Sequence, residues 1–97
     1  MRRDEAIAKL RWHDAELRRL GVERLYSVDS TARGEAREGS EVDMFFDYQR
    51  GKFGLFELMD VKGQTSRILG CNSDIMTRDS LHKLLRSRIE ASALRVF

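Results

Sequence analysis

The segment EVDMFFDY, residues 41–48, constrains the fold most strongly because its side chains alternate with a period of two. In a strand, residues two apart point to the same side of the sheet. One face therefore carries three apolar side chains and the other carries two carboxylates: Val42, Met44 and Phe46 against Glu41 and Asp43. The pattern predicts a strand whose apolar face enters the core and whose acidic face borders a cleft. Asp47 follows on the acidic face, where a solvated side chain is expected.

Helical and strand patterns alternate along the rest of the chain. We expect a helix over 4–20 ending at Gly21, strands over 22–28, 41–48 and 71–76, a turn and short helix over 29–35, a helix over 55–69, and a final helix capped by Asp79 or Ser80. The last four residues, LRVF, fit either a strand or a frayed end. This order predicts an α/β or α+β fold in which helices cover a small sheet.

Size and composition narrow the classes of protein that the chain can belong to. A length of 97 residues predicts a single domain over 1–97. The 18 basic and 16 acidic residues are interleaved, which indicates a mixed-sign surface and gives little support to generic RNA binding. Cys71 is the only cysteine, so we expect no intramolecular disulfide and a reducing, cytoplasmic setting. The charged start of the sequence does not fit a signal peptide, and no apolar run fits a membrane span.

Three carboxylates form a candidate metal site. Glu41 and Asp43 lie about 6.6 Å apart along one strand face, and flexible carboxylates at that separation can converge on a hard cation such as Mg²⁺. Asp74 alternates with Ser73 and Ile75, so it leaves the core face too if its strand lies beside the first. Three neighbouring carboxylates repel one another unless a cation compensates them. The alternative is an acidic but solvated sheet face with no metal.

A candidate anion site lies just before this strand. A short helix is expected to begin near Ser30, and the free N–H groups of its first turn, together with the serine hydroxyl, can bind a phosphate. Arg33 and Arg37 add positive charge. The alternative is that Ser30 or Asp29 only caps the helix.

The stretch DSTARGEAREGSEVDMFFDY, residues 29–48, resembles the signature of the minimal nucleotidyltransferases of the DNA polymerase β superfamily. In that signature a Gly-Ser pair opens a short helix and Ser-Asp-x-Asp follows on the next strand. The resemblance extends through GLFELMDVK, SDIMTRDSLH and LRSRIEASALRVF, which covers nearly the whole chain after the first helix. It implies the nucleotidyltransferase fold, a small mixed sheet of about three strands flanked by about four helices.

The resemblance also implies an activity and a partner. The family commonly occurs as the antitoxin partner of a HEPN-domain ribonuclease toxin, and some members transfer AMP from ATP onto a tyrosine of that toxin. This implies ATP as substrate, a site for two Mg²⁺ ions and a HEPN protein as acceptor. Because the sequence has no RNA-binding fingerprint, we expect no direct binding of nucleic acid. The oligomeric state stays open, and both a homo-oligomer and a hetero-oligomer fit the sequence. Ser30 matches the serine that contacts the triphosphate, beside Asp29 and Arg33. Glu41 and Asp43 match the paired metal ligands, and Asp74 matches the carboxylate that helps to deprotonate the attacking hydroxyl.

Two positions depart from the family pattern. Asp29 replaces the family glycine and places bulk and negative charge beside a polyanion. Glu41 replaces an aspartate and lengthens one ligand arm by a methylene. A second reading therefore stays open, in which the protein is a catalytically inactive antitoxin that neutralises its ribonuclease by direct complex formation. Trp12, Phe53 and Phe56 are candidate interface residues in that reading, or core residues otherwise.

Overall fold

The computed structural model describes residues 3–28, 42–51, 53–71 and 73–97. The helices are α1 (Arg3–Trp12), α2 (Asp14–Arg19), α3 (Leu55–Leu69) and α4 (Lys83–Ser92), with a 3₁₀ turn η2 (Arg78–Ser80). The strands are β1 (Val22–Val28), β2 (Val42–Tyr48), β3 (Ser73–Thr77) and β4 (Leu94–Arg95). Four of the predicted site residues, Asp29, Ser30, Arg33 and Glu41, lie outside the described residues, as does the short helix expected over 29–35.

One mixed sheet organises the described part of the chain. Its strand order is β3-β2-β1-β4, with β1 antiparallel to β2 and β4, and β2 parallel to β3. The predicted α+β class and mixed sheet are confirmed. The sheet has four strands rather than about three, because Leu94 and Arg95 of the LRVF terminus pair with Ser27 and Tyr26.

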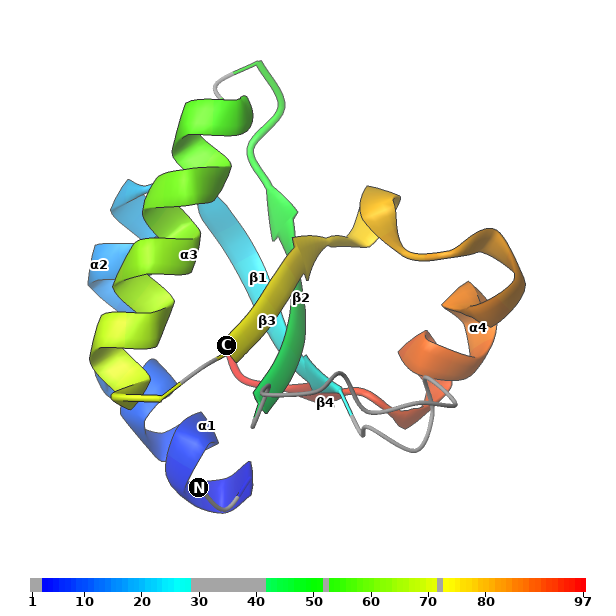
Figure 1. Ribbon diagram of the computed structural model, residues 1–97, viewed down its shortest axis with the longest axis horizontal. Coiled ribbons are helices and arrows are strands. Elements are labelled where there is room, and N and C mark those ends of the chain that lie inside the picture. Colours follow the sequence, from blue (N-terminus) through cyan, green and yellow to red (C-terminus); the bar gives the residue numbers. More distant parts are fainter. Residues whose placement is uncertain (1–2, 29–41, 52, 72) are drawn as a thin grey trace.

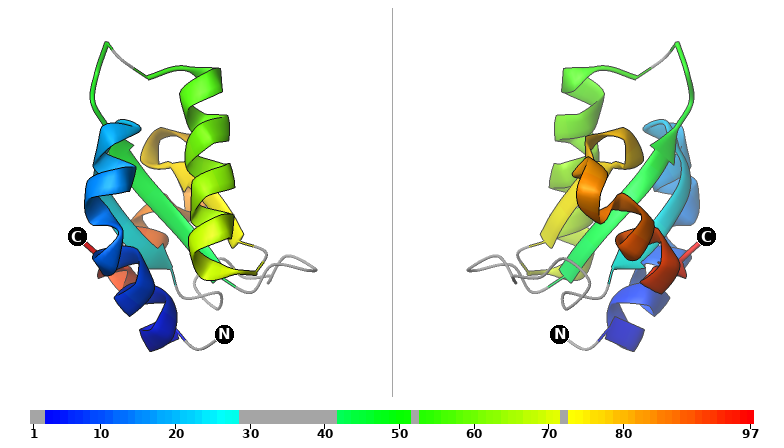
Figure 2. Two further views of the ribbon diagram at one scale, coloured as in Figure 1. Left: turned by 90° about the vertical axis from the view of Figure 1, so that its left-hand side faces the viewer. Right: turned by 90° about the vertical axis from the view of Figure 1, so that its right-hand side faces the viewer.

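The helices cover the sheet on both faces (Figures 1 and 2): α1, α2 and α3 lie on one side and α4 on the other. The first side holds the main core, to which β2 contributes Val42, Met44 and Phe46. The second side holds a smaller core of Val28, Phe45, Leu81 and Ile89. The predicted apolar face of β2 is therefore confirmed. Among the described residues, no helix is long and apolar enough to cross a membrane.

The first predicted helix is two helices in the structure. Its apolar stripe is confirmed, since Ala6, Leu10 and Leu17 are at most 1% exposed. The helix breaks at His13, whose N–H donates to the carbonyl oxygen of Leu10 at 3.2 Å in a tight turn. Asp14 then begins α2, which agrees with the preference of aspartate for a helix start over a helix interior.

The expected cap of the last helix was wrong. Asp79 and Ser80 lie in η2, where the Tyr48 hydroxyl donates to Asp79 Oδ2 at 2.8 Å and the Ser80 hydroxyl contacts Thr77 Oγ1 at 2.8 Å. Both side chains are therefore already engaged. His82 caps α4 instead, because its Nδ1 accepts the N–H of Leu84 at 3.2 Å.

Candidate active site

The parallel pairing of β2 and β3 brings together two of the predicted carboxylates. Asp43 is the direct partner of Asp74 in the register, between the pairs Val42–Ser73 and Met44–Ile75. Neighbouring strands lie about 4.8 Å apart, so the two residues are adjacent across the sheet. The predicted juxtaposition of Asp43 with Asp74 is thus present in the structure.

Both carboxylates leave the sheet on the side opposite the main core. Side chains alternate along a strand, so Asp43 shares its face with Phe45, which belongs to the smaller core. Asp43 is only 7% exposed and Asp74 is half-buried, and neither residue is without an interaction partner. Low exposure strengthens electrostatic interactions at this edge because less water screens them.

The end of β1 and the start of β2 lie beside the two aspartates. Val28, the last residue of β1, is the direct partner of Asp43, and Val42 opens β2. The described ends of both strands are therefore neighbours of Asp43. Glu41, the third predicted ligand, immediately precedes Val42 in the sequence.

The chemistry of the described pair fits a hard divalent cation. Carboxylate oxygens are the preferred protein ligands of Mg²⁺, which commonly uses one or two carboxylates together with water and substrate phosphates. Within residues 3–28, 42–51, 53–71 and 73–97 there is no group of three His, Cys, Asp or Glu side chains that could hold a metal ion. Asp43 and Asp74 are therefore the described part of the predicted ligand set, and Glu41 stays a prediction.

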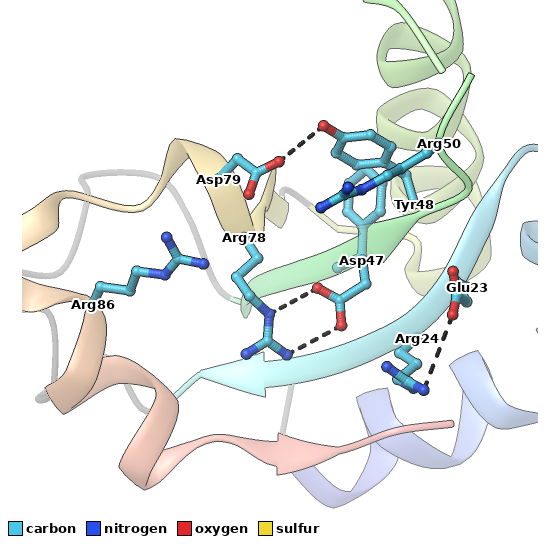
Figure 3. A pocket seen from close by; sticks show the side chains of 9 residues that line it. Glu23, Arg24, Asp47, Tyr48, Arg50, Arg78, Asp79 and Arg86 are labelled. Atoms are coloured by element: carbon cyan, nitrogen blue, oxygen red, sulfur yellow. Dashed lines mark hydrogen bonds and ion pairs between the residues drawn. The ribbon is translucent and has the colours of Figure 1, made fainter. Parts of the chain in front are cut away.

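A second polar cluster lies farther along the same sheet face. The Arg78 guanidinium donates from Nε to Asp47 Oδ1 at 2.7 Å and from Nη2 to Asp47 Oδ2 at 3.1 Å (Figure 3). Its Nη1 donates to Glu90 Oε2 at 3.0 Å, and its carbon Cζ lies 5.0 Å from the ring centres of Tyr26 and Phe45. Contact with Asp47 and Glu90 raises the pKa of Arg78 above its ordinary value.

The expectation that Asp47 is a solvated residue was wrong, since its side chain is 22% exposed and is paired with Arg78. A sequence signal for this pair exists: Asp47 follows Asp43 by four residues, and Arg78 follows Asp74 by four. The register that holds Asp43 against Asp74 runs to Phe46 and Thr77, so Asp47 and Arg78 come directly after its last pair.

A cavity of about 630 Å³ borders this cluster, lined by Glu23, Arg24, Phe46, Asp47, Tyr48, Arg50, Arg78, Asp79 and Arg86. Its charges are largely compensated inside the protein, because Arg78 and Arg86 both donate to Glu90 and Arg78 also donates to Asp47. At its rim the Tyr48 hydroxyl donates to Asp79, and this hydrogen bond raises the pKa of Tyr48 (Figure 3). Asp43 and Asp74 do not line the cavity.

The candidate interface aromatics fall into two groups. Phe53 is half-buried and packs against Phe46 and Tyr48, with ring centres 5.4 and 4.9 Å apart, so it is a core residue. Trp12 and Phe56 are 85% and 79% exposed. These two aromatic rings are available on the surface of α1 and α3.

Comparison with known proteins decides the family. The sequence model of the nucleotidyltransferase domain family matches residues 10–96, which is nearly the whole chain. The chain belongs to the nucleotidyltransferase domain family. The nucleotidyltransferase match includes β2 and β3 and therefore both described aspartates.

Two relatives of this nucleotidyltransferase-domain chain are named for protein adenylylation. A "putative protein adenylyltransferase" of Methanocaldococcus jannaschii is 36% identical over 76 residues, covering 78% of this chain and 81% of the relative. The "protein adenylyltransferase MntA" of Thermococcus cleftensis is 32% identical over 79 residues, covering 80% of this chain and 79% of the relative.

Solved structures agree on the fold. A structure described as a "putative minimal nucleotidyltransferase" superimposes with a TM-score of 0.65 at 29% identity, covering 95% of this chain and 89% of the other. A toxin–antitoxin structure with AMP-PNP has a TM-score of 0.61 at 12% identity, covering 90% of this chain and 72% of the other, and supports the fold alone.

Proposed function

We propose that the protein is a magnesium-dependent adenylyltransferase that transfers AMP from ATP to a hydroxyl group of a HEPN-domain toxin. The observation that carries the proposal is the parallel register that places Asp43 directly opposite Asp74 at one edge of the sheet. The names of the two relatives, both called protein adenylyltransferases, support the choice of a protein acceptor.

Each proposed site residue has a role in this reaction. Asp43, Asp74 and Glu41 bind Mg²⁺, which stabilises negative charge on the phosphate oxygens when it is bound. Ser30 and Arg33 bind the triphosphate, beside Asp29. Asp74 accepts the proton of the acceptor hydroxyl as that oxygen attacks the α-phosphorus. A bond forms between the hydroxyl oxygen and phosphorus, the bond to the β-phosphate oxygen breaks, and pyrophosphate leaves.

Incubation of a purified HEPN toxin with ATP labelled at the α-phosphate tests the proposal, because transfer of AMP would label the toxin. We expect labelling with the wild type in the presence of Mg²⁺ and its loss in Asp43→Asn. Asp74→Asn should label about 10²–10⁴-fold more slowly, the usual contribution of a general base. Asp60→Asn is the matched control because Asp60 is exposed on α3, which covers the side of the sheet opposite to Asp43 and Asp74. A toxin that acquires no label at saturating ATP and Mg²⁺ would refute the proposal.

A second candidate function is neutralisation of the toxin by binding alone. The exposure of Trp12 and Phe56 favours it, since aromatic anchors are enriched at protein interfaces. Asp29, in place of the family glycine, adds charge where a triphosphate is expected to bind.

Calorimetric titration of ATP and Mg²⁺ into the wild type and into Asp29→Gly separates the two functions. Binding to both proteins supports the transferase. Binding to Asp29→Gly alone supports neutralisation without transfer. In that case Asp43→Ala should still neutralise the toxin, whereas Trp12→Ala or Phe56→Ala should weaken the complex.

A further inference from the structure

The acidic pair begins a row of three residue pairs along one face of the sheet, of which the first two are cross-strand pairs. Asp43 lies opposite Asp74, and Phe45 lies opposite Met76 two residues farther along. The strand pairing ends at Phe46 and Thr77. The next residues, Asp47 of β2 and Arg78 of η2, are joined by two side-chain hydrogen bonds of 2.7 and 3.1 Å. Figure 3 shows both contacts between the end of β2 and the start of η2.

The apolar pattern of β3 leaves its register open to a shift by two residues. β3 has five residues and, within the described sheet, it is an edge strand paired only with β2. A slip by one residue would turn its apolar side chains out of the core, and burial opposes that slip. A slip by two residues preserves the alternation, so the apolar pattern discriminates against it far less. In one direction such a slip would place Asp74 opposite Phe45 and Arg78 opposite Gln49, breaking both the acidic pair and the Arg78 ion pair.

We propose that Asp47 and Arg78 are positioning residues whose ion pair fixes the register of β3 on β2 and thereby holds Asp74 opposite Asp43. The guanidinium suits this role because its planar fork engages a carboxylate through two parallel hydrogen bonds, which define both position and orientation. The expected effect of this ion pair on metal binding rests on the function proposed above. Its effect on the register of β3 does not depend on that function.

The surroundings of Arg78 keep the fork in place. Glu90 of α4 accepts from Nη1, and the rings of Tyr26 and Phe45 lie under the guanidinium. Arg78 and Asp47 are only 24% and 22% exposed, so solvent screens their pairing less than it screens an open surface pair. Glu90 binds the same guanidinium from α4, and Glu90→Gln therefore provides a matched control.

Disulfide formation measures the register without any need for activity. With Cys71→Ser in the background, Asp43→Cys and Asp74→Cys place two thiols on directly paired residues, within the usual Cα separation for a disulfide. We expect Asp47→Asn to slow oxidation several-fold and Asp47→Glu to restore much of the rate. Glu90→Gln, which removes the other carboxylate from Arg78, should leave the rate close to that of the parent.

Mn²⁺ binding to the protein with both native aspartates provides the second readout. Asp47→Asn should weaken Mn²⁺ binding about 10-fold, the usual effect of a residue that orients metal ligands. Glu90→Gln should not. Equal oxidation rates in the parent and in Asp47→Asn, or equal losses in Asp47→Asn and Glu90→Gln, would overturn the inference. A wild type that binds no Mn²⁺ would contradict the proposed function, and the oxidation rates would still decide the register.

Discussion

The strongest test of the packing is truncation of Ile89, the residue that anchors α4 to the sheet. Ile89 is 2% exposed and lies in the smaller core with Val28, Phe45 and Leu81. Ile89→Ala removes three carbon atoms, worth about 0.8 kcal/mol each in transfer free energy, and leaves a cavity. We expect a loss of about 3 kcal/mol in the free energy of unfolding, a large fraction of the ~5–15 kcal/mol typical of such domains.

Leu84→Ala is the matched control. It removes the same number of carbon atoms from the same helix, but Leu84 is 87% exposed, so we expect a change below about 0.5 kcal/mol. Urea unfolding at 25 °C measures both differences, and the thermal midpoint of Ile89→Ala should fall by about 12–24 °C. Equal destabilisation by the two variants, or a loss below about 1 kcal/mol for Ile89→Ala, would show that α4 does not pack on the sheet in this way.

Further predictions concern a tyrosine and two glycines. The hydrogen bond to Asp79 raises the pKa of Tyr48, so its stabilisation is complete below the ordinary tyrosine pKa near 10 and is lost as pH rises through the folded value. Asp79→Asn should therefore lower the pH at which Tyr48 absorbs as tyrosinate; an unchanged titration would contradict the contact. Gly70→Ala should destabilise by about 1–2 kcal/mol because Gly70 ends α3 at φ 69°, in the left-handed region. Gly63→Ala should stabilise by about 0.5–1 kcal/mol, since Gly63 lies inside α3 and an added Cβ meets open space; unfolding curves that move in the same direction for both glycines would refute this reasoning.

Period-two alternation was sufficient to predict the orientation of β2. Burial of Val42, Met44 and Phe46 in the main core follows from that pattern alone, and it puts Asp43 on the opposite face. Pairing with Asp74 was also foreseeable in outline, because Asp74 alternates with Ile75 in the same way. The exact partner of Asp43 was not foreseeable from the pattern, since alternation fixes the face of a strand but not a shift by two residues.

The errors in the sequence reading arise from contacts between distant residues. Aspartate is a common helix cap, yet the carboxylate of Asp79 accepts a hydrogen bond from Tyr48, 31 residues earlier. Asp47 is a residue type that is common on solvated strand faces, yet its carboxylate accepts a hydrogen bond from Arg78 of η2. In each case a polar side chain with a common local role found a stronger partner across the sheet, and local propensity carries no information about that partner.

The three residue pairs on this face of the sheet predict different effects for substitutions at each pair. Changes at Asp43 should abolish transfer and changes at Asp74 should slow it about 10²–10⁴-fold, because both residues belong to the proposed site itself. Changes at Phe45 remove the packing of α4 and should lower stability and activity together, because Phe45 is 1% exposed between the two polar pairs. Asp47→Asn leaves both the ligands and the core intact, so it should weaken metal binding with only a small loss of stability. If discrete residue pairs hold this face, the three kinds of substitution should produce these three different effects. A loss that depended only on distance from Asp43 and Asp74 would contradict this view.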